Sequence, residues 1–238
     1  MTLDEKLEYI KKHCKKRAPE IKLYLANEVS EVSKGKIPEM WYKIFAEEDI
    51  DKRKDMVLGV WKKYMSESYK KTIEYLEDNL INVELLRVDD KYSMLYSIKK
   101  KNGKAILYEG GNLMEQQKTV TLESHWNKIP LSIRSFYENV HDGFYHYSSW
   151  SMGMDALKNV TYFNEYEWGI LEELEEPLQI NIATTFGFFN DCAGGYVAVD
   201  TENCNDDNAT RWYSDEQPEY NQKFWELVDE WTLIGLEG

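Results

Sequence analysis

The stretch Phe186–Asp200, FGFFNDCAGGYVAVD, constrains the architecture of this chain most strongly. It follows Leu178–Ile182, LQINI, in which every second residue is apolar, as in a strand with one buried face. Residues 190–195, NDCAGG, tolerate positive φ and predict a turn. Tyr196–Val199 is a second β-prone run, and residues 209–213, ATRWY, offer a third strand. We therefore predict an antiparallel meander centred on this stretch.

A second meander is predicted upstream, where the apolar period changes to two. The strand-like runs are residues 83–88, 92–98 and 105–108. Asp89-Asp90 and residues 101–104, KNGK, are the turns between them, and Asn-Gly is a strong hairpin signal. Residues 118–122 are predicted to be another strand or a linker.

Helical periodicity covers much of the rest of the chain. The predicted helical segments are 3–33, broken into two helices at Pro19, then 38–45, 51–80, 131–140 ended by Gly143, and 218–235 ended by Gly235. The aromatic run Phe144–Trp150 is predicted to lie over the sheet. The expected fold is α+β: a mostly antiparallel sheet with packed helices, preceded by an N-terminal helical segment and a β-meander. The predicted divisions are residues 1–80, 81–118 and 119–238.

Length and composition place the chain among folded globular proteins. It has 238 residues, with 17 Tyr and 8 Trp but only 5 Pro. Cys14, Cys192 and Cys204 are odd in number and show no CxxC spacing, which argues against a disulfide framework and against a zinc site. A Cys192–Cys204 disulfide remains the alternative. The expected location is the cytoplasm, with no targeting signal and no membrane span.

Charge is distributed unevenly along the chain, whose net charge is −14. Residues 1–118 contain 24 Lys/Arg and 21 Asp/Glu, a net charge of +3. Residues 119–238 contain 5 Lys/Arg and 22 Asp/Glu, a net charge of −17. Such an acidic half repels nucleic acid and anionic lipid and attracts a basic partner. Simple solubility is the alternative explanation.

Chemistry-bearing motifs are scarce. Residues 190–195 lack the remaining glycines and the lysine of a phosphate-binding loop. Asp200–Asp207 resembles the start of a calcium loop, but it lacks the glycine at the sixth position and the glutamate at the twelfth, which is Arg211. We therefore expect no catalytic residues, no cofactor and no metal, with a weak cation site in this loop left open as the alternative.

The C-terminal half combines several features in a particular order. Trp126 precedes a proline-led helix that starts at Ile129-Pro130 and stops near Gly143. A strand–turn–strand unit at Gly187–Asp200 follows, and then a strand with Trp212 and a final helix from Phe224-Trp225 to Trp231. This order and spacing resemble the SUKH superfamily, the group of yeast cell-wall regulators and bacterial immunity proteins. NDCAGG replaces the acidic-Gly pairs of the family's turn, and residues before 118 have no counterpart.

The resemblance implies an α+β fold without catalytic residues. It also implies the role of many bacterial members, which bind and neutralise a polymorphic toxin domain, often a nuclease. Because such a domain is typically basic, the acidic half is a suitable binding face. The alternative is a non-catalytic scaffold or regulatory module, as in the eukaryotic branch, and a third class is an enzyme of unrecognised type.

Our functional hypothesis is therefore an immunity-type inhibitor of a basic toxin domain, with no direct contact to nucleic acid or membrane. Acidic residues in two segments, with aromatic anchors between and beside them, form the predicted binding site. These residues are Glu172, Glu173, Glu175, Glu176, Asp206, Asp207, Trp150 and Trp168. The identity of the toxin, the oligomeric state and the role of residues 1–118 stay open.

Overall fold

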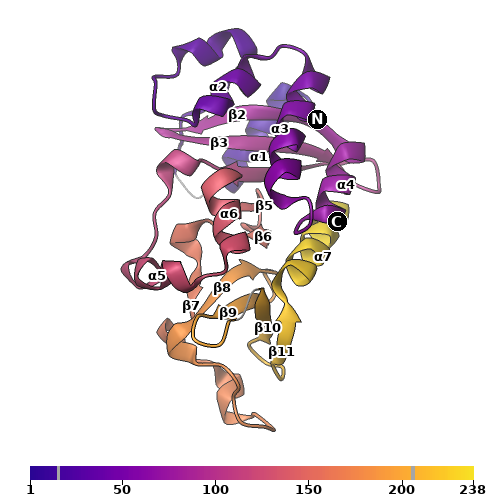
Figure 1. Cartoon of the computed structure of the whole chain (residues 1–238). Coiled ribbons are helices and arrows are strands. Elements are labelled where there is room, and N and C mark those ends of the chain that lie inside the picture. The colour runs from indigo at the N-terminus through magenta and orange to yellow at the C-terminus, as the bar shows by residue number, and fades with distance from the viewer. Residues whose placement is uncertain (15–16, 205–206) are drawn as a thin grey trace.

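One antiparallel sheet of eleven strands runs through the chain in the computed structural model, which describes residues 1–14, 17–204 and 207–238 (Figure 1). The strand order is β1-β2-β3-β4-β5-β6-β8-β9-β10-β11, and β7 pairs with β8 beside this path. The strands are β1 Ile21–Leu23, β2 Leu80–Val88, β3 Lys91–Lys99, β4 Ala105–Gly111, β5 Phe144–His146, β6 Ser151–Met154, β7 Thr161–Tyr162, β8 Thr185–Asn190, β9 Gly195–Asp200, β10 Asn208–Tyr213 and β11 Glu219–Lys223. The α+β fold class is confirmed.

Helices cover the sheet and fill its connections. The α-helices are α1 Leu3–His13, α2 Glu39–Ala46, α3 Ile50–Met65, α4 Lys70–Asn79, α5 Val120–His125, α6 Leu131–Asn139 and α7 Phe224–Glu237. The 3-10 helices are η1 Ala26–Glu31, η2 Leu113–Glu115, η3 Trp126–Lys128, η4 Leu157–Asn159, η5 Phe163–Glu165, η6 Gly169–Glu172 and η7 Ile182–Thr184. None of the helices in the described ranges combines the length and apolarity that a membrane span requires.

The main core lies on one face of the sheet, under α3, α4, α6 and α7. Alternation along the strands explains why both faces are apolar: Val83 and Leu85 enter this core, whereas Leu86 points to the opposite face. There Leu86 and Leu95 pack against Ile10 of α1. The helix α1 therefore lies on the far side of the sheet from α3 (Figure 1).

A long irregular segment covers the opposite face at the C-terminal end of the sheet. We call this segment, residues 163–182, the strap. Its Phe163, Trp168 and Ile170 pack against Ala198 of β9 and Trp212 of β10. The strap contains η5 and η6 but no strand. Apolar contacts and a few hydrogen bonds to side chains, and not a ladder of backbone hydrogen bonds, hold it on the sheet.

Strand pairing and a helix cap are among the contacts that join the N-terminal and C-terminal parts of the chain. The β4 strand pairs with β5, so the upstream meander and the downstream strands belong to one sheet. On the helical face, the Asp229 carboxylate of α7 accepts hydrogen bonds from the backbone N–H groups of Lys71 and Thr72, both at 2.8 Å. Asp229 thus serves as the N-terminal cap of α4, whose own preceding residue, Tyr69, provides no side-chain cap.

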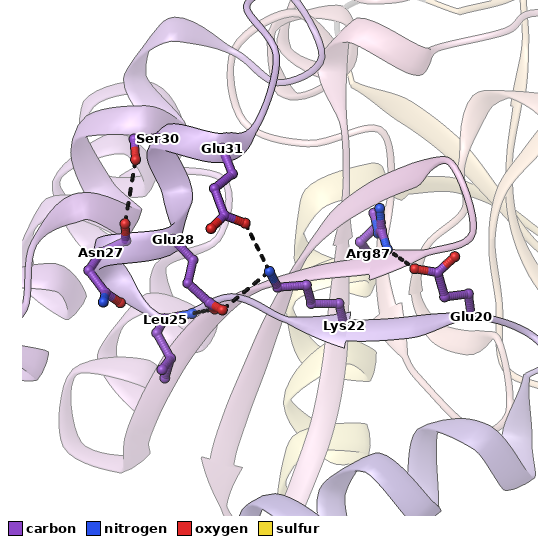
Figure 2. A network of polar contacts seen from close by, with 8 residues as sticks. All are labelled: Glu20, Lys22, Leu25, Asn27, Glu28, Ser30, Glu31 and Arg87. Carbon is purple, nitrogen blue, oxygen red and sulfur yellow. Dashed lines mark hydrogen bonds and ion pairs between the residues drawn. The ribbon is translucent and has the colours of Figure 1, made fainter.

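The edge strand β1 is protected by charge (Figure 2). Lys22 lies between Glu28 and Glu31 of η1, at 3.2 Å from each carboxylate. Arg87 on the neighbouring β2 pairs with Glu20. A lysine and its ion pairs on an edge strand discourage pairing with another chain, since an incoming strand would have to displace them.

Six local predictions are wrong. Residues 51–80 form two helices, α3 and α4, instead of one. Residues 144–146 form β5 inside the sheet, between β4 and β6, where we expected the run Phe144–Trp150 to lie over the sheet. Residues 21–33 form β1 and η1 instead of a second helix. Residues 178–182 are irregular, and β8 begins only at Thr185. Residues 120–125 form the short helix α5, where we expected a strand or a linker. Residues 219–223 form β11, and the last helix runs through Gly235 to Glu237.

Candidate partner-binding surface

Two segments far apart in sequence meet at one end of the sheet. Gln217, in the turn between β10 and β11, makes two hydrogen bonds to the strap. Its Nε2 donates to the carbonyl of Glu173 at 3.0 Å, and its Oε1 accepts from the N–H of Glu175 at 3.1 Å. A single amide side chain therefore fixes the acidic part of the strap beside the turn.

This contact brings two groups of carboxylates to the same end of the sheet. We call the set the acidic tip: Glu172, Glu173, Glu175 and Glu176 from the strap, with Asp215 and Glu216 from the turn. All six side chains are exposed. None of them forms an ion pair with another described residue. The four predicted glutamates thus lie together, and Asp215 and Glu216 join them although they were not among the predicted site residues.

The predicted anchor Trp168 is buried, with only 8% of its surface exposed. Its indole Nε1 donates to the carbonyl of Phe163 at 2.9 Å. Its ring packs edge-on against Trp212 at a centroid distance of 5.3 Å. The Trp168 ring packs between the strap and the sheet, so it is not accessible to a partner. The placement as an exposed anchor is corrected for this reason.

The exposed aromatic residue of this region is Tyr166, which the sequence analysis did not single out. Its side chain is 55% exposed. The ring lies 5.7 Å from that of Trp168. A tyrosine next to an exposed acidic surface is suited to anchor a partner, because its ring has a large contact area and few rotatable bonds.

Trp150 lies elsewhere, in the turn between β5 and β6. It is half-buried, and its ring stacks on Tyr145 at a centroid distance of 5.8 Å. Tyr145 belongs to β5, whose neighbours are β4 and β6. Trp150 therefore packs on different elements from those that form the acidic tip.

Asp207 also lies apart from the four glutamates. It precedes β10, whereas the Gln217 contact lies beyond the other end of β10, about 17 Å along the strand. Asp207 lines a cleft of about 690 Å³ together with Lys128 and Lys223, and its charge contributes to raising the pKa of Lys223, after the larger effect of the Glu226 carboxylate. Asp206 lies outside the described residues.

The loop that resembles the start of a calcium site uses its first carboxylate internally. Asp200 accepts hydrogen bonds from the Thr184 hydroxyl at 2.6 Å, from the N–H of Asn181 at 2.9 Å and from the N–H of Glu202 at 3.0 Å. Burial raises the pKa of Asp200, but these hydrogen bonds outweigh it and leave the pKa below its ordinary value. In the part of the chain with described positions, no group of three or more His, Cys, Asp or Glu side chains is arranged to hold a metal ion.

Comparison of the chain with known protein families, curated proteins and solved structures found no match.

Proposed function

We propose that this protein is a non-catalytic, immunity-type inhibitor that binds a basic toxin domain through the acidic tip. The observation that carries the proposal is the gathering of six exposed carboxylates that form no ion pair with another described residue. Opposite charges on a partner would steer association and match the tip during docking. A partner would not need to break an existing ion pair at these residues before it binds.

Rigid support beneath the tip favours the same proposal. The Trp168–Trp212 contact and the two hydrogen bonds of Gln217 hold the strap in one arrangement before any partner arrives. Preorganisation of this kind lowers the entropy cost of binding. The excess of acidic residues in the C-terminal half disfavours a nucleic acid as the partner and favours a protein that itself binds nucleic acid, such as a nuclease domain.

The test is affinity purification of the tagged protein from its own cells, followed by quantitative binding to the captured partner. The decisive variant is E172K/E173K/E175K/E176K. The matched control is E39K/E48K/D55K/E74K, which makes the same change in charge at four exposed residues of the N-terminal half. We expect capture of a basic partner that is lost at high salt, and affinity at least tenfold weaker for the tip variant but within threefold for the control.

A second arm tests inhibition directly. Expression of the captured partner should arrest growth, and co-expression of the wild-type chain should restore it, whereas co-expression of the tip variant should not. The proposal would be wrong if the tip variant and the control bound equally well. Capture of several unrelated partners, none of them toxic, would support the scaffold alternative instead.

A further inference from the structure

Tyr166 is the aromatic residue with the most unusual environment in this protein. The chain is rich in Tyr, Trp and Phe, but among those in the described ranges only Tyr166 is exposed, and the others are buried or half-buried. Apolar surface of this size is normally buried or used for binding. Its position on the strap, four residues before Ile170, places it close in sequence to the glutamates of the acidic tip.

The ring of Tyr166 is held by a rigid base. The backbone N–H of Tyr166 donates to the carbonyl of Phe163 at 3.3 Å. One side of the ring contacts Trp168 at an interplanar angle of 42°. Trp168 is itself fixed against Phe163 and Trp212. The ring is therefore presented to solvent by buried aromatic neighbours, and a ligand that stacks on it would meet a preorganised surface.

Negative charge flanks this ring on both sides in the sequence. Glu165 and Glu167 are exposed, and neither forms an ion pair with another described residue. The cation–ring pairs of the described chain involve other rings: Tyr24, Tyr64, Trp126 and Tyr213. Tyr166 and its two glutamates thus provide an aromatic face and carboxylates without a cation from the described residues.

At the same end of the sheet, the chain holds one of its own arginines beside a tyrosine ring and a carboxylate. The guanidinium of Arg211 lies 5.6 Å from the centre of the Tyr213 ring, and it also pairs with the carboxylate of Glu219. An arginine is therefore held between a tyrosine ring and a glutamate within the chain itself. Planar guanidinium groups suit such sites because they stack on aromatic rings and bind carboxylates through two N–H groups.

We infer that Tyr166, together with Glu165 and Glu167, binds an arginine side chain of the partner. The inference rests on the proposed function, because it names the chemistry by which the partner of the acidic tip is recognised. The Tyr166 ring would distinguish arginine from lysine, because the compact ammonium ion of lysine does not stack on a ring as a flat group. The glutamates of the acidic tip attract either cation and supply no such distinction.

The test uses two probes, acetylated and amidated hexa-arginine and hexa-lysine peptides, with wild-type protein and the variants Y166F and Y166L. Because Tyr166 is exposed, both variants are expected to fold, and thermal unfolding checks this. For wild-type and Y166F protein we expect about threefold tighter binding of hexa-arginine, together with shifts of the residue-166 ring signals in NMR spectra. For Y166L the two peptides should bind equally.

Each outcome separates the inference from the proposed function. Equal binding of both peptides by the wild-type protein, or an arginine preference that persists in Y166L, would overturn the inference. If the tip variant E172K/E173K/E175K/E176K still lost the captured partner, the proposed function would stand. Binding of neither peptide would count against both proposals. An arginine preference without a basic partner in cells would support the inference and contradict the proposed function.

Discussion

His141 and Asp142 are neighbours in the chain whose burial moves their pKa values in opposite directions. Burial lowers the pKa of His141 to about 3 and raises the pKa of Asp142 to about 6. The Nε2 of His141 is 2.6 Å from the hydroxyl of Tyr96, and the carboxylate of Asp142 accepts from the N–H of Leu157 at 2.9 Å. Two core groups therefore give opposing dependences of stability on pH.

The sign of each dependence follows from which state binds the proton. The unfolded chain protonates His141 near its ordinary pKa of 6.5 and the folded chain does not, so this contribution is complete above pH 6.5 and is lost toward pH 3. Asp142 acts oppositely, because the folded chain keeps a proton that the unfolded chain releases above 3.8. Its contribution is complete below pH 3.8 and is lost as the pH rises through 6.

We predict that His141→Phe lowers the slope of unfolding free energy against pH by about 1.4 kcal/mol per pH unit between pH 4 and 6. Asp142→Asn should raise this slope by a similar amount between pH 4 and 5.5. Urea unfolding at half-unit steps of pH measures both slopes. Comparing slopes removes the pH-independent cost of each substitution. A His141→Phe slope equal to that of the wild type would show that His141 titrates normally in the fold.

A second residue-scale prediction concerns Lys6 and Glu84, an ion pair beneath α1. Their side chains are only 8% and 15% exposed. Removing one charge leaves the other buried without its partner, so Glu84→Gln should lower the free energy of unfolding by about 3 kcal/mol. The double variant K6M/E84M removes both charges and should stay within about 1 kcal/mol of the wild type. Equal losses for the single and double variants in urea unfolding would contradict this account.

The sequence indicated the exposure of the four clustered glutamates but not the burial of Trp168. Four neighbouring glutamates in an irregular segment indicate an exposed surface, and they are exposed. Trp168 and Tyr166 are two residues apart, but one is buried and the other is exposed. Which of the two side chains is buried depends on Trp212, which lies more than forty residues away in the sequence and packs on Trp168. No local pattern contains that contact.

At the scale of elements, alternation in residues 178–182 correctly indicated one-sided burial but wrongly predicted a strand. Leu178, Ile180 and Ile182 are partly buried against the aromatic cluster under the strap. Alternation reports which side chains face the protein, and a strand additionally needs a neighbour with free backbone groups. The upstream meander was predicted correctly because each strand there has its partner directly adjacent in sequence.

The strap gives a prediction at this scale. Gln217→Ala removes both hydrogen bonds that tie residues 173 and 175 to the turn. We expect faster amide hydrogen exchange in residues 172–176, with a change of less than about 1.5 kcal/mol in the global free energy of unfolding. Gln179→Ala, at an exposed glutamine of the same segment, is the matched control. Unchanged exchange in Gln217→Ala would mean that the other contacts of the strap hold residues 172–176 without Gln217.

At the scale of the whole molecule, the two halves differ in how their charges are compensated. Residues 119–238 have a net charge of −17, and the ion pairs within this half of the described chain are Arg211–Glu219 and Lys223–Glu226. Like charges that lack partners destabilise the folded state, and salt screens them.

We therefore predict that raising NaCl from 10 to 200 mM increases the Tm by about 2–4 °C, as expected for about 1 kcal/mol in a chain of this size. The variant E172Q/E173Q/E175Q/E176Q should show a smaller increase, because it removes four of the mutually repelling charges. Calorimetry at pH 7.5 measures both. A fall in Tm with salt would show that attractive ion pairs dominate the electrostatics of the fold.

The cap that Asp229 places on α4 couples the order of synthesis to the order of folding. The N–H groups of Lys71 and Thr72 donate to the carboxylate of Asp229, which lies more than 150 residues later in the chain. During translation, α4 therefore leaves the ribosome with its first turn open to water. Because α7 is synthesised more than 150 residues after α4, α4 gains this cap only once α7 has emerged and packed against it.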